Sequence, residues 1–166
     1  MGLGSALGLL LILPLGGCTL SQSASTQALL HAVAGGCAGT VVTDSVPPAW
    51  AQSGFTHKGA PWAVPWALGT DGSVVAYLFT TQLVAGTSPR ADGSNNKVGW
   101  AIKDRSSPLI EGRPLGTAQP VVSVHGNIVD VPTAGCWTFR VLWGEHREHV
   151  STINLEVLPA GTLPAK

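Results

Sequence analysis

The sequence predicts an all-β fold, a two-layer antiparallel β-sandwich of about seven strands. The chain of 166 residues contains 21 Gly and 12 Pro, which favour a turn-rich β architecture over a helical bundle. Beyond the first 17 residues, only the short segment Thr26–Val33 shows the apolar spacing of a helix. Short β-favouring segments recur between turn signals. The expected strands are Thr40–Val46, Ser73–Leu83, Lys97–Lys103, Pro108–Glu111, Pro120–His125, Cys136–Trp143 and Val150–Leu158.

The last two of these segments carry the clearest pattern. In both, residues alternate with a period of two, which places one set of side chains on each face of a sheet. The intervening residues 144–148 would join the two strands as an antiparallel hairpin. Arg140 would then face outward and pair across the hairpin with a neighbour such as Glu156. The residues expected in the core are Ile153, Leu155 and Val157, and those expected in water are Asn154 and Glu156.

The charge balance excludes some functions. Nine basic side chains are matched by nine acidic ones, so the formal net charge is zero. Nucleic-acid binders and polybasic membrane-surface proteins need an excess of Lys and Arg on one face. We therefore expect no nucleic-acid partner.

The N-terminus has the pattern of a secretion signal. The apolar run Leu7–Leu15 is too short to span a bilayer. The residues that follow it, Leu15-Gly16-Gly17-Cys18, resemble a bacterial lipobox. That resemblance implies lipidation of Cys18, which would attach the protein to the cell membrane or outer membrane, outside the cytoplasm. A second candidate, Ala34-Gly35-Gly36-Cys37, follows a more polar stretch and is weaker, and a buried N-terminal helix with a chance cysteine remains an alternative.

These features suggest a division of the chain. Residues 1–17 would be the lipoprotein signal peptide and residues 18–38 a lipid-anchored tether, because Thr19–Gln27 is polar. Residues 39–160 would form the β-sandwich domain, and residues 161–166 a C-terminal tail.

The cysteine count agrees with an extracytoplasmic location. Of three cysteines, one is assigned to lipid, which leaves Cys37 and Cys136 as a single pair. A disulfide between them would join the start of the domain to a late strand in an oxidising compartment. Two buried free thiols are the alternative.

Several segments together resemble a group of uncharacterised secreted or lipid-anchored bacterial proteins. The Ala134-Gly135-Cys136-Trp137 piece is also similar to the strand entry of immunoglobulin-like sandwiches, where a cysteine enters the core. The resemblance implies an immunoglobulin-like fold and an envelope location, and it implies no chemistry. The segments are Pro65-Trp66 ahead of Gly72, Val74–Phe79, Asn96–Trp100, Glu111–Leu115 and Val131–Trp137.

Aromatic residues gather in a Pro-rich stretch without regular periodicity. Trp50, Trp62 and Trp66 lie there with Phe55 between them. Exposed indole rings could stack on sugar rings or on Pro-rich peptides, which predicts a ligand-binding platform. The alternative is that the rings pack down onto the sandwich, because a long loop needs a small core of its own.

Two histidines that are close in the sequence suggest a metal-binding site. His146 and His149 lie in the expected hairpin connection beside Glu145 and Glu148, and such side chains suit zinc or copper. The spacing supplies no third ligand, and a run of this kind is more often a solvated, charge-paired hairpin tip.

The sequence contains no catalytic motif of the common hydrolases or phosphate-binding enzymes. We therefore expect a cell-envelope lipoprotein that is not an enzyme, holds no cofactor, and binds a protein, a peptide or a glycan. A metal-binding protein that uses His146 and His149 is the alternative, and a small hydrolase is a remote one.

Overall fold

The computed structural model describes Met1 and residues 31–56 and 59–163, and these form a sandwich of two five-stranded sheets. Sheet A has the strand order β1-β2-β3-β4-β6, and sheet B has the order β5-β10-β9-β7-β8. A single turn of 3-10 helix, η1 (Ala49–Ala51), precedes β3. The strands are β1 (Ala32–Val33), β2 (Val42–Thr43), β3 (Trp66–Leu68), β4 (Val74–Leu78), β5 (Leu83–Val84), β6 (Val98–Ile102), β7 (Leu109–Pro114), β8 (Val122–Val124), β9 (Gly135–Trp143) and β10 (His149–Leu158).

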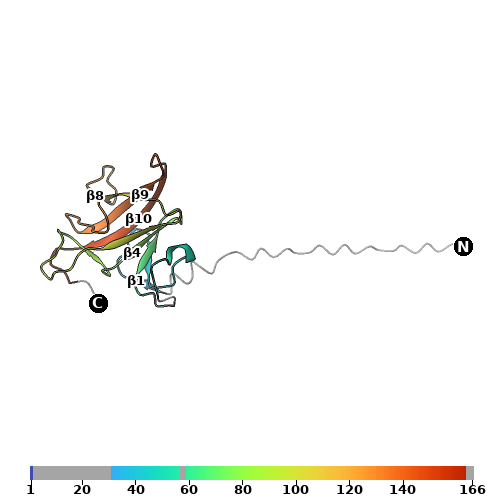
Figure 1. The fold of residues 1–166 in the computed structure, drawn as a ribbon, viewed down its shortest axis with the longest axis horizontal. Coiled ribbons are helices and arrows are strands. Elements are labelled where there is room, and N and C mark those ends of the chain that lie inside the picture. Colours follow the sequence, from blue (N-terminus) through green and yellow to red (C-terminus); the bar gives the residue numbers. More distant parts are fainter. Residues whose placement is uncertain (2–30, 57–58, 164–166) are drawn as a thin grey trace.

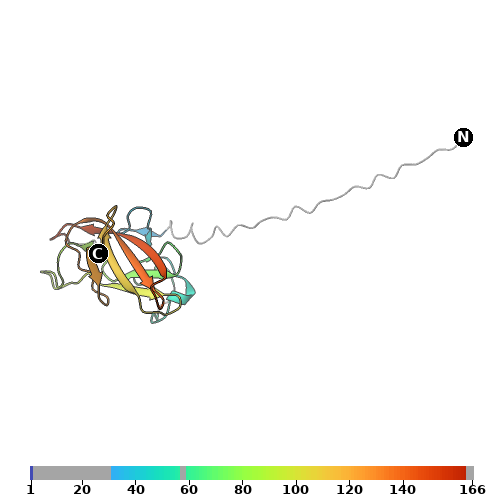
Figure 2. The same ribbon diagram turned by 90° about the horizontal axis from the view of Figure 1, so that it is seen from above.

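The two layers are visible in Figure 1, where β8, β9 and β10 lie on one side and β1 and β4 on the other. In Figure 2 the orange and red strands of sheet B lie over the green strands of sheet A. The teal segment around η1 lies beside sheet A, on the side away from sheet B. Among the described residues, no helix is long and apolar enough to cross a membrane.

The core between the sheets confirms the predicted alternation. Trp137, Phe139 and Val141 of β9 are fully buried, and Ile153 and Leu155 of β10 pack with them. The two strands pair antiparallel over their full length, and residues 144–148 connect them as expected. The hairpin is therefore the longest paired unit of sheet B, and its apolar face supplies much of the core.

The structure has more strands than the sequence predicted, because the sequence pattern did not identify three very short strands. β1, β3 and β5 contain only two or three residues each, too few to show a period of two. β5 also pairs parallel to β10, so sheet B is mixed and not purely antiparallel. The predicted segment Ser73–Leu83 is divided between β4 and β5, which belong to different sheets.

The domain begins earlier than residue 39. β1 pairs with β2, Gly36 bridges to Leu155 of β10, and Gly35 accepts a hydrogen bond from the Glu156 amide at 2.8 Å. Residues 31–38, which we assigned to the tether, therefore belong to the sandwich. The rest of the predicted tether and the signal peptide lie outside the described residues, as does most of the predicted helical segment 26–33.

The disulfide between Cys37 and Cys136 is present, with the Cα atoms 5.9 Å apart. It joins the segment before β2 to the start of β9, as predicted. The outward position of Arg140 is likewise as expected, but its partner is not: the guanidinium is 3.2 Å from Glu111 on β7, the strand on the other side of β9 from β10. Glu156 instead accepts a hydrogen bond from Gln82.

Candidate functional site

A groove of about 500 Å³ runs beside β6 at the edge of sheet A. Its walls come from four parts of the chain: the segment around η1, the end of β4, β6 with the residues on either side of it, and Asn127 after β8. Five aromatic residues line it. They are Trp50, Phe55, Tyr77, Phe79 and Trp100.

The floor of the groove is a second hydrophobic cluster on the outer face of sheet A. Trp62, Trp66 and Tyr77 are buried in it, and Phe55 packs against it. The Phe55 ring centroid lies 5.3 Å from that of Trp62 and 4.8 Å from that of Tyr77. Tilted contacts at these distances stabilise aromatic pairs beyond the area that they bury.

Two hydrogen bonds fix the covering segment to the sheet. The Tyr77 hydroxyl donates to the Ala51 carbonyl of η1 at 2.5 Å, and the Trp66 indole donates to the Ser45 carbonyl at 2.7 Å. Burial raises the pKa of Tyr77 to about 12, so this hydroxyl stays protonated and able to donate well above neutral pH. These two hydrogen bonds hold the covering segment against the cluster that forms the floor of the groove.

The predicted tryptophan platform is only partly present. Trp62 and Trp66 are 3% and 6% exposed, so they support the groove from beneath and offer no stacking surface. Trp50 is half-buried and does line the groove. The prediction of an exposed platform of three tryptophans is thus wrong for two of them, because the Pro-rich loop packs its own core onto sheet A.

Sequence reasoning missed the aromatic residues that the strands contribute. Tyr77 and Phe79 are two positions apart at the end of β4, so both project from the outer face of sheet A, and Phe79 is 47% exposed. Their spacing is a signal that could have been used. Gly99 lies under the Phe79 ring, where an added Cβ would come within 3.0 Å of the ring. A glycine at this position lets the Phe79 ring approach the β6 backbone closely.

The charged side chains of the groove are all basic. Lys97 and Arg105 are exposed and line it, and no Asp or Glu does. The Lys97 ammonium lies 4.9 Å from the centroid of the Phe79 ring, a cation–π geometry. Among the described residues, neither cation forms an ion pair. The groove is therefore electropositive as well as aromatic.

The Trp100 side chain lies at the boundary between the groove and the core. Its ring centroid is 6.0 Å from that of Phe139, and it packs against the main core. Its indole N–H is buried and has no acceptor within the described part of the chain. An unpaired buried donor of this kind costs about 1–3 kcal/mol.

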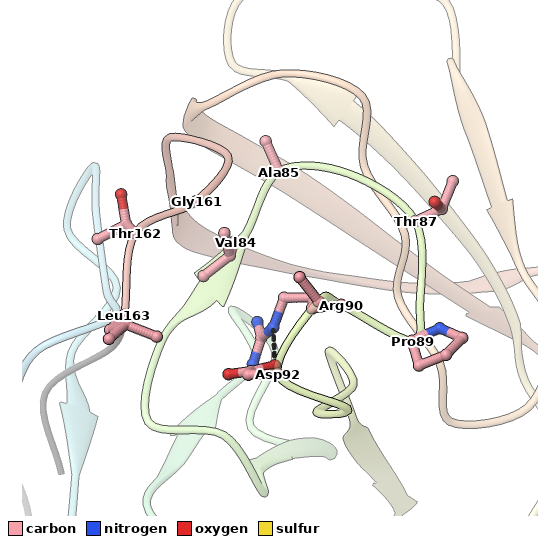
Figure 3. A pocket seen from close by; sticks show the side chains of 10 residues that line it. Val84, Ala85, Thr87, Pro89, Arg90, Asp92, Gly161, Thr162 and Leu163 are labelled. Atoms are coloured by element: carbon pink, nitrogen blue, oxygen red, sulfur yellow. Dashed lines mark ion pairs between the residues drawn. The ribbon is translucent and has the colours of Figure 1, made fainter.

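A second depression of about 370 Å³ lies between the loop after β5 and the residues after β10. Figure 3 shows Arg90 beside Asp92 at its centre, with Gly161, Thr162 and Leu163 on the opposite side. The Arg90 guanidinium already donates to Ser94 at 2.7 Å and to Asn96 at 2.8 Å. Because its one cation is held by the protein itself, this depression is a weaker candidate than the groove.

The two histidines of the metal hypothesis lie on the exposed hairpin. The His149 ring centroid is 5.5 Å from that of Trp143, and its Nε2 is 3.9 Å from a Glu148 carboxylate oxygen. The other oxygen of this carboxylate accepts a hydrogen bond from the His146 amide, and hydrogen bonds from the backbone amides of Glu148 and His146 lower the pKa of Glu148. Within residues 31–56 and 59–163, no three or more His, Cys, Asp or Glu side chains gather closely enough to hold a metal ion.

Cys37 is held in the disulfide, so the second lipobox-like sequence ends on a cysteine that is already bonded. Cys18 lies outside the described residues. No protein-family model matches the chain, and no curated protein or solved structure is similar enough to it to count as a match.

Proposed function

We propose that this chain is a lipid-anchored protein of a bacterial cell envelope that binds a ligand in the groove beside β6 and is not an enzyme. The observation that carries the binding function is the groove itself. Its aromatic walls rest on a buried cluster that packs the floor of the groove. Packed aromatic sites of this kind lose little conformational entropy when a ligand binds.

The envelope location rests on the cysteines and on the N-terminal sequence. A disulfide between Cys37 and Cys136 favours an oxidising compartment. The chain has three cysteines, so Cys18 is the remaining one, and it directly follows the apolar run and the two glycines of the lipobox-like sequence. Membrane attachment through a lipid on Cys18 agrees with both observations.

The groove suits a ligand with apolar and hydrogen-bonding groups, such as a segment of an envelope protein, a peptide or a glycan. Aromatic faces contact all three without requiring charge. The zero net charge gives no support to a nucleic-acid ligand. No observation on the described residues favours the metal or hydrolase alternatives.

The anchor is tested with Cys18→Ala in the bacterium. The wild-type chain should incorporate labelled palmitate and sediment with membranes, and globomycin, which inhibits lipoprotein signal peptidase, should block its maturation. Cys18→Ala should not incorporate palmitate, should not sediment with membranes and should not be matured by this peptidase. The control Ser23→Ala should behave as wild type. If Cys18→Ala is processed and retained on the membrane normally, the proposed anchor is wrong.

The groove is tested by screening the purified chain against arrays of peptides and of glycans. Trp50→Ala and Phe79→Ala should abolish binding of any ligand found. Leu115→Ala is the matched control, because Leu115 is about as exposed as Phe79 (49% against 47%) but lies outside the groove. Failure of both arrays, or binding that persists in both groove variants, would show that the groove is not a binding site.

A further inference from the structure

The backbone of β6 is paired on one side only. The amide of Phe79 donates to Lys97 and that of Lys103 donates to Ser73, so the odd-numbered residues of β6 bond to β4. In an antiparallel ladder the alternate residues then point their N–H and C=O groups away from the partner. The N–H and C=O groups of Trp100 therefore point to the outer edge of the sheet, where no described residue forms a hydrogen bond with them.

A short neighbour covers only the start of this edge. Val98 donates to Asn127 at 2.8 Å, and Val129 donates to Asn96 at 2.8 Å. The preceding residue, Gly126, has a φ of +71°, and the chain before it belongs to β8 in sheet B. The pairing with this segment therefore stops at Asn127. The Ile102 carbonyl accepts a hydrogen bond from the Arg105 amide at 2.9 Å, so the N–H and C=O groups of Trp100 are the open part of the edge.

The groove follows this open edge. Its lining includes four consecutive residues of β6, from Gly99 to Ile102, although neighbouring side chains of a strand point to opposite faces. A depression that touches all four extends from the outer face of sheet A to the backbone edge of the strand. An unpaired strand edge beside aromatic walls is the geometry in which an extended peptide can be added to a sheet.

The charges identify the kind of peptide. Lys97 precedes β6 and Arg105 follows it, so an unpaired cation stands near each end of the open edge. β6 has five residues, a length of about 16 Å at the usual rise per residue. A peptide of similar length with a carboxylate near each end would complement both cations.

Two other occupants fit these charges less well. A second copy that paired antiparallel about Trp100 would place Lys97 opposite Lys103, and like charges that face each other oppose pairing. The N-terminal residues 1–30 of the chain contain no Asp or Glu, so they offer nothing to the two cations.

From these observations we infer that the groove binds an extended acidic peptide segment of another protein, which pairs with β6 as an additional strand. The inference rests on the proposed binding function and specifies its ligand. The peptide backbone bonds to the Trp100 edge, apolar side chains contact Phe79 and its aromatic neighbours, and terminal carboxylates meet Lys97 and Arg105.

The charge requirement is tested with the full chain in detergent and a set of blocked heptapeptides. In each peptide, Val, Phe or Tyr alternates with Thr between two terminal glutamates. Members of the set should bind, and binding should weaken at least about tenfold when lysines replace the glutamates. Lys97→Glu should weaken binding as much, whereas Lys103→Glu, the same change on an exposed residue outside the groove, should have little effect.

The strand pairing is tested by methylating the amides of the best peptide. Only alternate amides of an added strand face β6, so methylation of one alternate set should abolish binding and methylation of the other should leave most of it. Equal loss from both sets, or from neither, would overturn pairing with β6.

The controls separate this inference from the function on which it rests. Binding of glycans but not of peptides, lost in Phe79→Ala, would overturn the acidic peptide and leave the binding function standing. Self-association that Phe79→Ala abolishes, with no peptide binding, would identify a second copy as the occupant and also overturn it. Failure of every ligand class would remove the proposed function itself.

Discussion

The outer faces of the two sheets differ in what covers them. On sheet B two outward side chains of β9 are polar and pair with neighbouring strands: Thr138 donates to Asn154 at 2.8 Å, and Arg140 is 3.2 Å from Glu111. On sheet A all five residues of β4 are buried, because the segment around η1 covers the outer face with a second hydrophobic cluster.

This difference explains why the groove lies where it does. A strand that is apolar on both faces needs a cover on each, and the loop between β2 and β3 supplies the outer one. The cover extends over β4 but leaves β6 open, so Phe79 remains 47% exposed at its margin. On sheet B, Thr138 and Arg140 have polar partners on neighbouring strands, so this part of the outer face needs no apolar cover.

The largest expected effect comes from the core that both sheets share. Phe139 is fully buried and contacts Trp100 of the opposite sheet. Phe139→Ala should lower the free energy of unfolding by about 3–5 kcal/mol, because it removes a large buried side chain and leaves a cavity. Urea unfolding followed by tryptophan fluorescence measures this. A loss no larger than that of the exposed control Leu115→Ala would contradict the assigned core.

The disulfide should have the next largest effect. It closes a loop between residues 99 positions apart and ties the segment before β2 to β9. The double variant Cys37→Ser with Cys136→Ser should lose about 2–4 kcal/mol of stability, chiefly because its unfolded chain is less constrained. Urea unfolding of the wild type with and without a reductant should show a similar loss. An unchanged midpoint in both measurements would contradict a stabilising bridge.

The sequence predicted sheet B better than sheet A for a physical reason. β9 and β10 are nine and ten residues long, and polar residues recur at alternate positions in each, so the alternation is easy to see. In β4 the buried residues do not alternate with polar ones, and β3 has only three residues. The strand Trp66–Leu68 was therefore hidden within a Pro-rich stretch that has no visible period.

The candidate site was less accessible to sequence reasoning than the fold. Trp50, one of the three tryptophans that the sequence singled out, lines the groove, but its neighbours Tyr77 and Trp100 come from strands that are distant in sequence. Which tryptophans face solvent depends on how the loop packs onto sheet A, and composition does not determine this. The open edge of β6 depends on strand order, which no local pattern contains.

The smallest predicted effects are the stability losses of two single variants, one in the outer cluster of sheet A and one on the outer face of sheet B. Tyr77→Phe keeps the buried ring but removes the donor to the Ala51 carbonyl, and it should cost about 1 kcal/mol at pH 8. Arg140→Met, which breaks a partly exposed ion pair on sheet B, should cost less than about 1 kcal/mol. Urea unfolding of both variants beside the wild type gives the two values.

The pH dependence of unfolding tests whether the buried hydroxyl of Tyr77 causes the stability loss expected for Tyr77→Phe. Its pKa rises from 10.0 to about 12 because burial disfavours the phenolate, so folding holds the hydroxyl in its neutral form. The resulting stability is fully present below pH 10 and is lost as the pH rises towards 12. Tyr77→Phe has no such group, so its stability should fall less between pH 8 and pH 11 than that of the wild type, and the gap between them should narrow. A constant gap over this range would mean that Tyr77 is not buried by the segment around η1, and the floor of the groove would then be wrongly assigned.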